Sequence, residues 1–94
     1  MGVKFTITYH AKVISDDIPK LSQADRRRIK NAIEQKLTAE PEVFGVPLRK
    51  SLRGYRKLRV GDYRIIFRIE EMVIKVFLIS HRSAVYKNTD KRMV

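Results

Sequence analysis

The spacing of apolar residues changes within the first third of the chain. Residues 3–9 alternate apolar and polar side chains, and this period of two predicts a strand with one buried face. Over residues 10–21 the apolar positions fall three or four apart, which predicts a helix. Pro19 lacks a backbone donor, so we expect this helix to weaken or kink near its end. The predicted buried side of the strand is Val3, Phe5, Ile7 and Tyr9.

A second helix is predicted to begin at Ser22. Serine is a favourable N-cap, and Asp25 lies in the first turn, near the positive end of the helix dipole. The helix should end before residues 38–47, whose two prolines and one glycine favour a loop. Its apolar stripe is formed by Ile29, Ile33 and Leu37.

After the loop a period of two returns and predicts a hairpin. Leu58 and Val60 alternate with basic residues, and a Gly-Asp pair then makes a tight turn. The next strand, residues 63–69, has two candidate buried sets, and we expect the longer one to face the core. These sets are the series Tyr63, Ile65 and Phe67, and the single Ile66.

The last long apolar segment is MVIKVFLIS, residues 72–80. It is apolar on both sides apart from Lys75, and a strand buried on both faces belongs in the middle of a sheet. The tail that follows is polar except for residues 84–86, which we expect to form a short last strand.

The predicted elements follow the order strand, helix, helix, strand, strand, strand. This β-α-α-β-β-β order indicates an α+β fold with a small, twisted, antiparallel-rich sheet. The helix pair should form a hairpin packed on one sheet face, which leaves the other face partly open and concave. A chain of 94 residues makes one domain, residues 1–94.

The composition is strongly basic, with 21 lysines and arginines against 10 acidic residues and a net charge of +11. Repulsion among so many positive charges costs stability, so we expect a polyanion or an acidic protein as partner, and not a basic composition that only aids solubility. Cysteine is absent, which excludes disulfides and thiolate metal sites. The chain start has no apolar signal region and no apolar run is long enough to span a membrane, so we expect a cytoplasmic protein without a membrane partner.

Strand alternation gathers cations on the open face of the predicted sheet. If Leu58 and Val60 face the helices, the residues between them face the open side, as do the arginines of the next strand. Tyr86 follows the last long strand, with His81 at the edge of the patch, and we expect no acid to neutralise it. The cations are Lys57, Arg59, Arg64, Arg68 and Arg82.

This patch suits RNA, because cations hold phosphates and a tyrosine ring stacks on an unpaired base. The alternative is a basic face that is merely solvated. The two histidines lie far apart in the sequence with no acidic cluster nearby, so we expect no metal and no other cofactor. His10 is interpreted as a residue at the start of the first helix.

Two segments, LRGYRKLRVGDYRIIFRI (residues 52–69) and VFLISHRSAVY (residues 76–86), resemble the RelE/ParE superfamily of bacterial toxins from type II toxin–antitoxin pairs. The resemblance extends over nearly the whole chain and implies a RelE-like fold. For the RelE branch it implies a ribosome-dependent endoribonuclease that cuts mRNA. For the ParE branch it implies a poison of DNA gyrase that cleaves nothing. Both kinds are held inactive by an antitoxin, typically with an acidic wrapping segment, and toxin and antitoxin can form a heterotetramer.

The resemblance to the RelE branch assigns roles by position. Its two basic hairpin residues fall on Lys57 and Arg59, with Arg56 as a rival to Lys57 and as a further RNA contact beside Arg68. The resemblance places the arginine after the turn, the arginine after the last long strand, the near-terminal tyrosine and the late histidine at Arg64, Arg82, Tyr86 and His81.

Such a site could cut RNA without metal if the RNA's own 2′-hydroxyl attacks the adjacent phosphorus. Arg59 and Arg64 would clamp the phosphate, and Arg82 would act on the leaving group. Tyrosine and lysine side chains have free pKa values near 10, so neither is a ready base at neutral pH. The candidates rank as Tyr86 by resemblance, then His81, then Lys57. An RNA-binding module without activity is a third hypothesis, beside the nuclease and the gyrase poison.

Overall fold

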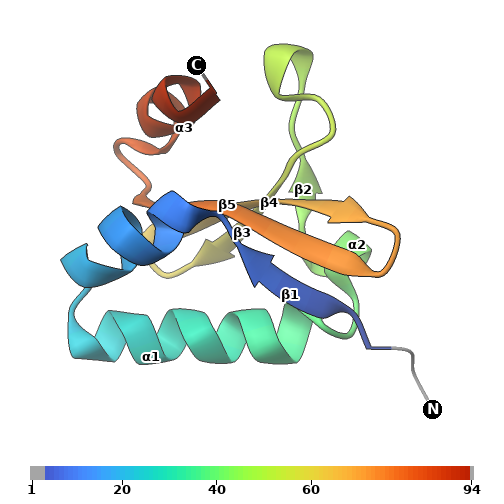
Figure 1. The fold of residues 1–94 in the computed structure, drawn as a ribbon, viewed down its shortest axis with the longest axis horizontal. Helices are drawn as coiled ribbons and strands as arrows, with labels where there is room; N and C mark the ends of the chain where they lie inside the picture. Colours follow the sequence, from blue (N-terminus) through green and yellow to red (C-terminus); the bar gives the residue numbers. More distant parts are fainter. Residues whose placement is uncertain (1–3, 94) are drawn as a thin grey trace.

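A five-stranded sheet runs through the centre of the computed structural model, which describes residues 4–93 (Figure 1). Strand β1 pairs with β5 in parallel, and all other neighbouring strands pair antiparallel. The antiparallel-rich sheet is therefore confirmed, while Val3 of the predicted first strand lies outside the described residues. In spatial order the strands are β1 (Thr6–Tyr9), β5 (Val73–His81), β4 (Tyr63–Glu70), β3 (Arg56–Val60) and β2 (Val46–Pro47).

Strand β5 lies between β1 and β4, as its apolar pattern predicts. Ile74 and Val76 are buried on one face of the sheet, while Leu78 is buried on the other. The β3–β4 hairpin turns at Gly61, whose φ of 59° lies in the left-handed region that favours glycine. The hairpin and the central strand are thus both confirmed.

The first half of the chain supplies the helices. The Ser22 hydroxyl accepts a hydrogen bond from the Asp25 backbone N–H at 3.1 Å, so the predicted N-cap is confirmed. Pro19 lies in a single tight turn, after which Leu21 is extended, so the first helix ends where its proline predicts. The helical segments are η1 (Val13–Asp17), η2 (Ile18–Lys20), α1 (Gln23–Ala32), η3 (Ile33–Leu37) and the short α2 (Pro41–Phe44).

The main core lies between these helices and the sheet. Ile65 and Phe67 are fully buried there, so the longer apolar series of β4 is the core set, as predicted. Burial of one side chain of this size stabilises the fold by about 1.5–3 kcal/mol. The other buried members of this core are Val13, Leu21, Ile29, Ile33, Leu37, Leu58, Val60, Ile74, Val76 and Ile79.

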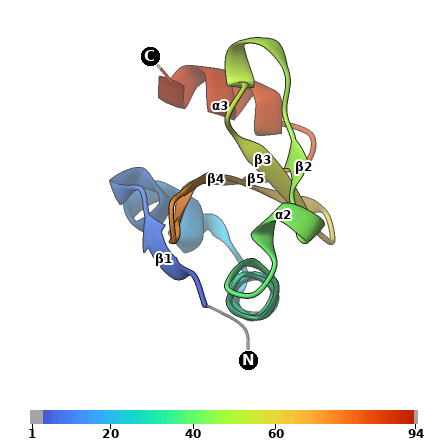
Figure 2. The same ribbon diagram turned by 90° about the vertical axis from the view of Figure 1, so that its right-hand side faces the viewer.

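The opposite face of the sheet is partly covered by a helix that the sequence did not predict. The tail forms α3 (Val85–Met93), so the expected short strand at residues 84–86 is wrong. Val85 and Thr89 lie one helical turn apart and are buried, and Val85 packs with Ile66 and Leu78 in a second, smaller core. Figure 2 shows α3 on one side of the sheet and α1 on the other. We call the side that carries α3 the α3 face.

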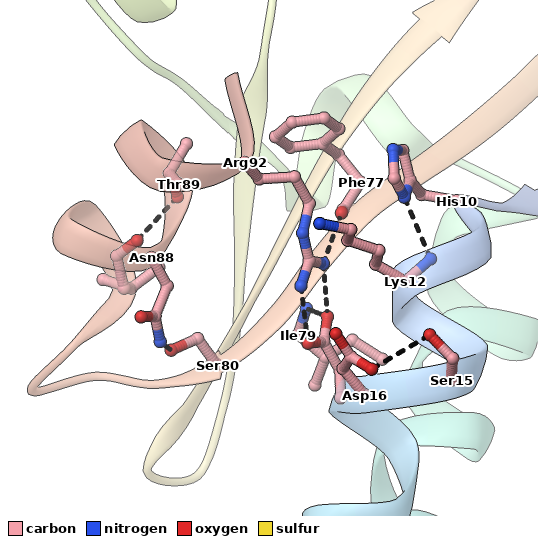
Figure 3. Close-up of polar contacts among 12 residues, drawn as sticks. His10, Lys12, Ser15, Asp16, Phe77, Ile79, Ser80, Asn88, Thr89 and Arg92 are labelled. Carbon is pink, nitrogen blue, oxygen red and sulfur yellow. Dashed lines mark hydrogen bonds and ion pairs between the residues drawn. The ribbon is translucent and has the colours of Figure 1, made fainter. Parts of the chain in front are cut away.

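Polar contacts hold α3 against the sheet (Figure 3). Asn88 donates to Ser80 Oγ at 2.9 Å, and Arg92 donates to the Phe77 carbonyl at 3.0 Å and to the carboxylate of Asp17. Figure 3 shows Arg92 reaching from the last turn of α3 toward β5. The position of the whole helix is therefore fixed from the sheet and from η1.

Candidate functional site

Lys57 and Tyr86 meet on the α3 face. Lys57 lies on β3 and Tyr86 in the first turn of α3, and Lys57 Nζ donates to Tyr86 Oη at 2.8 Å. Lys57 Nζ is 5.3 Å from the centre of the tyrosine ring, so the ammonium sits at the hydroxyl end of the ring and not over its face. Tyr86 is 50% exposed, which leaves the pair open to a substrate.

A groove of about 470 Å³ opens beside this pair, and we call it the Lys57 groove. One wall is the segment 46–52, which includes η4 (Lys50–Leu52), and the other is α3. Figure 2 shows this loop segment and α3 on the same side of the sheet. The groove is lined by the cations Arg49 and Lys50, and by Asp90 of α3. A chain with negative charges at regular intervals fits a groove of this composition.

Arg59 and Arg64 lie directly opposite each other on β3 and β4. Like charges at opposite positions of a sheet destabilise it. Arg64 Nη1 donates to the carbonyls of Gly61 and Tyr63, at 3.0 and 2.8 Å, which holds its guanidinium near the hairpin turn. These bonds use only part of its five N–H donors. A bound phosphate would relieve the repulsion between the two arginines.

Arg82 is not free of acidic neighbours, so the expectation that no acid neutralises the patch is wrong. Its Nε lies 3.6 Å from Oδ1 of Asp62, and its backbone N–H donates to the Asp62 carbonyl at 2.8 Å. The side chains are 63% and 71% exposed, so this ion pair is weak and easily exchanged for another anion.

Arg56 and Arg68 lie away from the Lys57–Tyr86 pair. Arg56 alternates with Lys57 along β3 and donates to the Gly45 carbonyl at 3.0 Å, so it faces the helix side and supports the chain after α2. Arg68 lies on the α3 face, further along β4, where its guanidinium is 5.6 Å from the centre of the Tyr55 ring. Arg56 is thus not a rival to Lys57 in position.

His81 is likewise not brought to Tyr86. It pairs across the sheet with Tyr63, and the two rings meet edge to face at 5.6 Å on the side of the main core. The backbone N–H of Ser83 donates to His81 Nδ1 at 3.2 Å, so the histidine stabilises the turn after β5. This geometry supports a structural role at the strand end.

Sequence reasoning missed three residues that line the groove. Arg49 and Lys50 lie between the predicted elements, and their basic character was the signal that could have marked them. Asp90 was missed because the sequence predicts a short strand at residues 84–86 and no helix beyond it, whereas the structure has α3 there. Within residues 4–93, no group of histidine, aspartate and glutamate side chains is placed to hold a metal ion. No helix in that range is long and apolar enough to cross a membrane.

Comparison with known families identifies the chain. The family model for the ParE toxin of type II toxin–antitoxin systems matches residues 10–86. The chain belongs to this toxin family. The RelE/ParE resemblance of the two quoted segments is therefore confirmed, and the protein is a type II toxin of that superfamily.

Two curated relatives of this toxin come from Mycobacterium tuberculosis. The toxins RelG and RelE of that organism are each 36% identical to the chain over 53 residues. The match covers 54% of this chain, 61% of RelG and 55% of RelE. The chain thus spans little more than half the length of the curated relatives that it matches.

Solved structures of toxins share the fold. The RelBE2 toxin–antitoxin complex from Mycobacterium tuberculosis is similar with a TM-score of 0.79 and 26% identity, over 86% of this chain and 94% of that chain. The RelB–RelE complex from Methanococcus jannaschii has a TM-score of 0.66 and 22% identity, over 85% and 95% of the two chains. A double mutant of the Escherichia coli toxin RelE in the free state has a TM-score of 0.65 and 17% identity, over 97% of this chain and 99% of that chain. The RelE-like fold is confirmed.

Proposed function

We propose that this toxin is a metal-independent endoribonuclease that cleaves mRNA on the ribosome and so inhibits translation. The observation that carries the proposal is the 2.8 Å contact between Lys57 Nζ and Tyr86 Oη at the edge of a basic groove. This contact pairs Tyr86, whose oxygen can move a proton, with Lys57, whose ammonium can stabilise negative charge on that oxygen. The ribosomal target would put the toxin to work in the cytoplasm.

The reaction would begin at the 2′-hydroxyl of the RNA. The deprotonated Tyr86 oxygen takes the proton of that hydroxyl, the 2′-oxygen attacks the adjacent phosphorus, and the bond to the 5′-oxygen breaks as that oxygen takes a proton from water. The products are a 2′,3′-cyclic phosphate and a 5′-hydroxyl. Negative charge on the Tyr86 oxygen is stabilised by the Lys57 ammonium that donates to it. General-base assistance of this kind contributes about 10²–10⁴-fold to a rate.

The arginines would bind the phosphate on which this charge develops. Arg59 and Arg64 repel each other without a ligand, and a phosphate between them converts that repulsion into forked hydrogen bonds. Arg82 would approach the leaving oxygen after exchanging its exposed Asp62 partner for the substrate. We leave His81 and Arg56 out of the centre, because their side chains serve the turn after β5 and the chain after α2.

An acidic antitoxin is the proposed protein partner. The net charge of +11 favours an acidic ligand, and the relatives of known structure include RelB–RelE antitoxin–toxin complexes. A heterotetramer with two copies of each chain is the assembly we propose to test. The toxin alone should arrest growth, and co-expression with an acidic antitoxin encoded beside it should restore growth.

Poisoning of DNA gyrase is the second candidate function, because the matching family model is that of the ParE toxin. The two functions are separated by adding purified toxin to ribosomes that translate a defined mRNA and, in parallel, to gyrase with relaxed plasmid. Cleavage within codons, with a cyclic phosphate at the new 3′ end, is the result expected for the nuclease. Intact mRNA together with inhibited supercoiling would instead identify the toxin as a gyrase poison.

A further inference from the structure

A second pocket lies on the α3 face, beside the Lys57 groove. Ile66 of β4 is opposite Lys57, and Arg68 follows two positions later, which is about 7 Å along the strand. Here the surface forms a pocket of about 320 Å³, at the small end of the range for ligand sites. We call it the aromatic pocket, and the residues that define it are His10, Tyr55, Arg68, Glu70, Lys75 and Phe77.

The Phe77 ring contacts two other rings in the aromatic part of this pocket. The Phe77 ring meets the His10 ring edge to face at 5.4 Å between centroids and meets the Tyr55 ring at 5.2 Å. Phe77 and Tyr55 are half-buried against the second core, so their rings are held by packing. Figure 3 shows Phe77 and His10 beside each other, on β5 and just after β1. A preformed ring cluster of this kind offers stacking area to a flat ligand.

Charged groups surround the rings. The Arg68 guanidinium lies 5.6 Å from the centre of the Tyr55 ring and 2.6 Å from Glu70 Oε2, and Lys75 Nζ lies 3.1 Å from Glu70 Oε1. The hydrogen bond from Lys75 lowers the pKa of Glu70, and the charge of Arg68 adds to this effect. The carboxylate therefore stays ionised at neutral pH. The pocket presents two cations and one acceptor next to an aromatic surface.

We propose that the aromatic pocket binds one base of the single-stranded RNA whose neighbouring phosphate lies at the Lys57–Tyr86 pair. The inference rests on the proposed nuclease function and adds a second contact for the same strand. A base stacks on aromatic rings, and its amino or imino groups donate to the Glu70 carboxylate. Arg68 and Lys75 then neutralise the adjoining phosphates. An acidic peptide fits less well, because its carboxylates do not stack on the rings.

The test is a titration of the full-length toxin with a short single-stranded RNA whose riboses are 2′-O-methylated, so that it cannot be cleaved. Backbone amide NMR shifts are followed for His10, Lys75 and Phe77 in the aromatic pocket and for Lys57 in the groove. An oligonucleotide with the same backbone but abasic positions is the control ligand. Base binding predicts that the pocket shifts disappear with the abasic ligand while the groove shifts persist.

Variants give a second readout. Tyr55→Leu and Lys75→Gln should each weaken binding of the 2′-O-methylated RNA by about fivefold or more. The matched controls are Phe44→Leu and Lys36→Gln, since Lys36 Nζ lies 5.5 Å from the centre of the Phe44 ring in α2. These controls should bind RNA as the parent does. Far-ultraviolet circular dichroism verifies that every variant is folded.

Three results would overturn the proposal. Equal pocket shifts with the abasic and the base-bearing ligand would assign the pocket to phosphates alone, and unshifted pocket amides at saturating RNA would remove it as a site. Stronger shifts with a polyglutamate peptide than with RNA would assign it to an acidic protein segment. Base-dependent shifts in a toxin that leaves mRNA intact on ribosomes would support the pocket and reject the nuclease, so the two failures are distinguishable.

Discussion

Arg92 and Asp17 form a two-pronged ion pair, with Nη1 to Oδ2 at 2.7 Å and Nη2 to Oδ1 at 2.9 Å, although the residues are 75 positions apart. Their side chains are only 10% and 7% exposed. Asp17 Oδ2 also accepts the backbone N–H of Ile79 at 2.9 Å, so the pair is tied into β5. Because Arg92 ends the helix whose first turn carries Tyr86, this pair helps to fix the position of the tyrosine.

Breaking this pair from one side should destabilise the toxin. Arg92→Met leaves the Asp17 carboxylate buried and uncompensated, and we expect the free energy of unfolding to fall by about 3–5 kcal/mol. Urea unfolding followed by circular dichroism measures the change. The control is Arg82→Met, which breaks an exposed ion pair and should cost about 0–1 kcal/mol. Equal costs for the two variants would show that the buried pair does not stabilise the fold.

Removal of Arg64 should abolish toxicity and leave the protein folded. Arg64→Ala loses two hydrogen bonds to the hairpin turn, each worth about 0.5–1.5 kcal/mol, but also relieves the repulsion with Arg59. Growth of cells expressing the variant measures toxicity. Arg27→Ala removes the same charge from an exposed position of α1, on the other side of the sheet, and should remain as toxic as the parent. A toxic Arg64→Ala variant would exclude Arg64 from the site.

The stability of the toxin should fall in alkaline solution through Tyr9. Burial raises the pKa of Tyr9 above its usual value near 10, and the charge of Glu34 adds to this effect. The unfolded chain therefore loses this proton first as the pH rises past 10, which favours unfolding. The effect is small, since Tyr9 is 37% exposed. Urea unfolding at pH 9 and 11 should show a larger fall for the parent than for Tyr9→Phe, and equal falls would contradict this.

The sequence predicted the elements in which a regular spacing of apolar residues continues over many positions. The alternation through β3 and β4 located Leu58, Val60, Ile65 and Phe67 in the core, and it put Lys57, Arg59 and Arg64 on the opposite face. Side chains alternate strictly along a strand, so the correct choice of the buried residues also determined which residues lie on the opposite face.

The tail was harder to predict, because its helical signal is short and partly polar. Val85 and Thr89 are buried one turn apart, but a threonine does not register as apolar, whereas residues 84–86 suggested a strand. Contacts between residues far apart in the sequence could not be predicted either. Neither the Arg92–Asp17 pair nor the Arg82–Asp62 pair leaves any trace in local periodicity. The same holds for Arg56, whose role depends on a carbonyl in a loop.

The most direct test of the account compares the parent toxin with Tyr86→Phe on ribosomes stalled with a defined mRNA. The variant keeps the ring and loses only the oxygen that Lys57 contacts. If this oxygen takes the 2′ proton, the single-turnover rate of mRNA cleavage should fall by about 100-fold or more, with toxin binding to the ribosome unchanged. Cleavage by Tyr86→Phe at the rate of the parent would contradict the central claim that Lys57 and Tyr86 form the reactive centre.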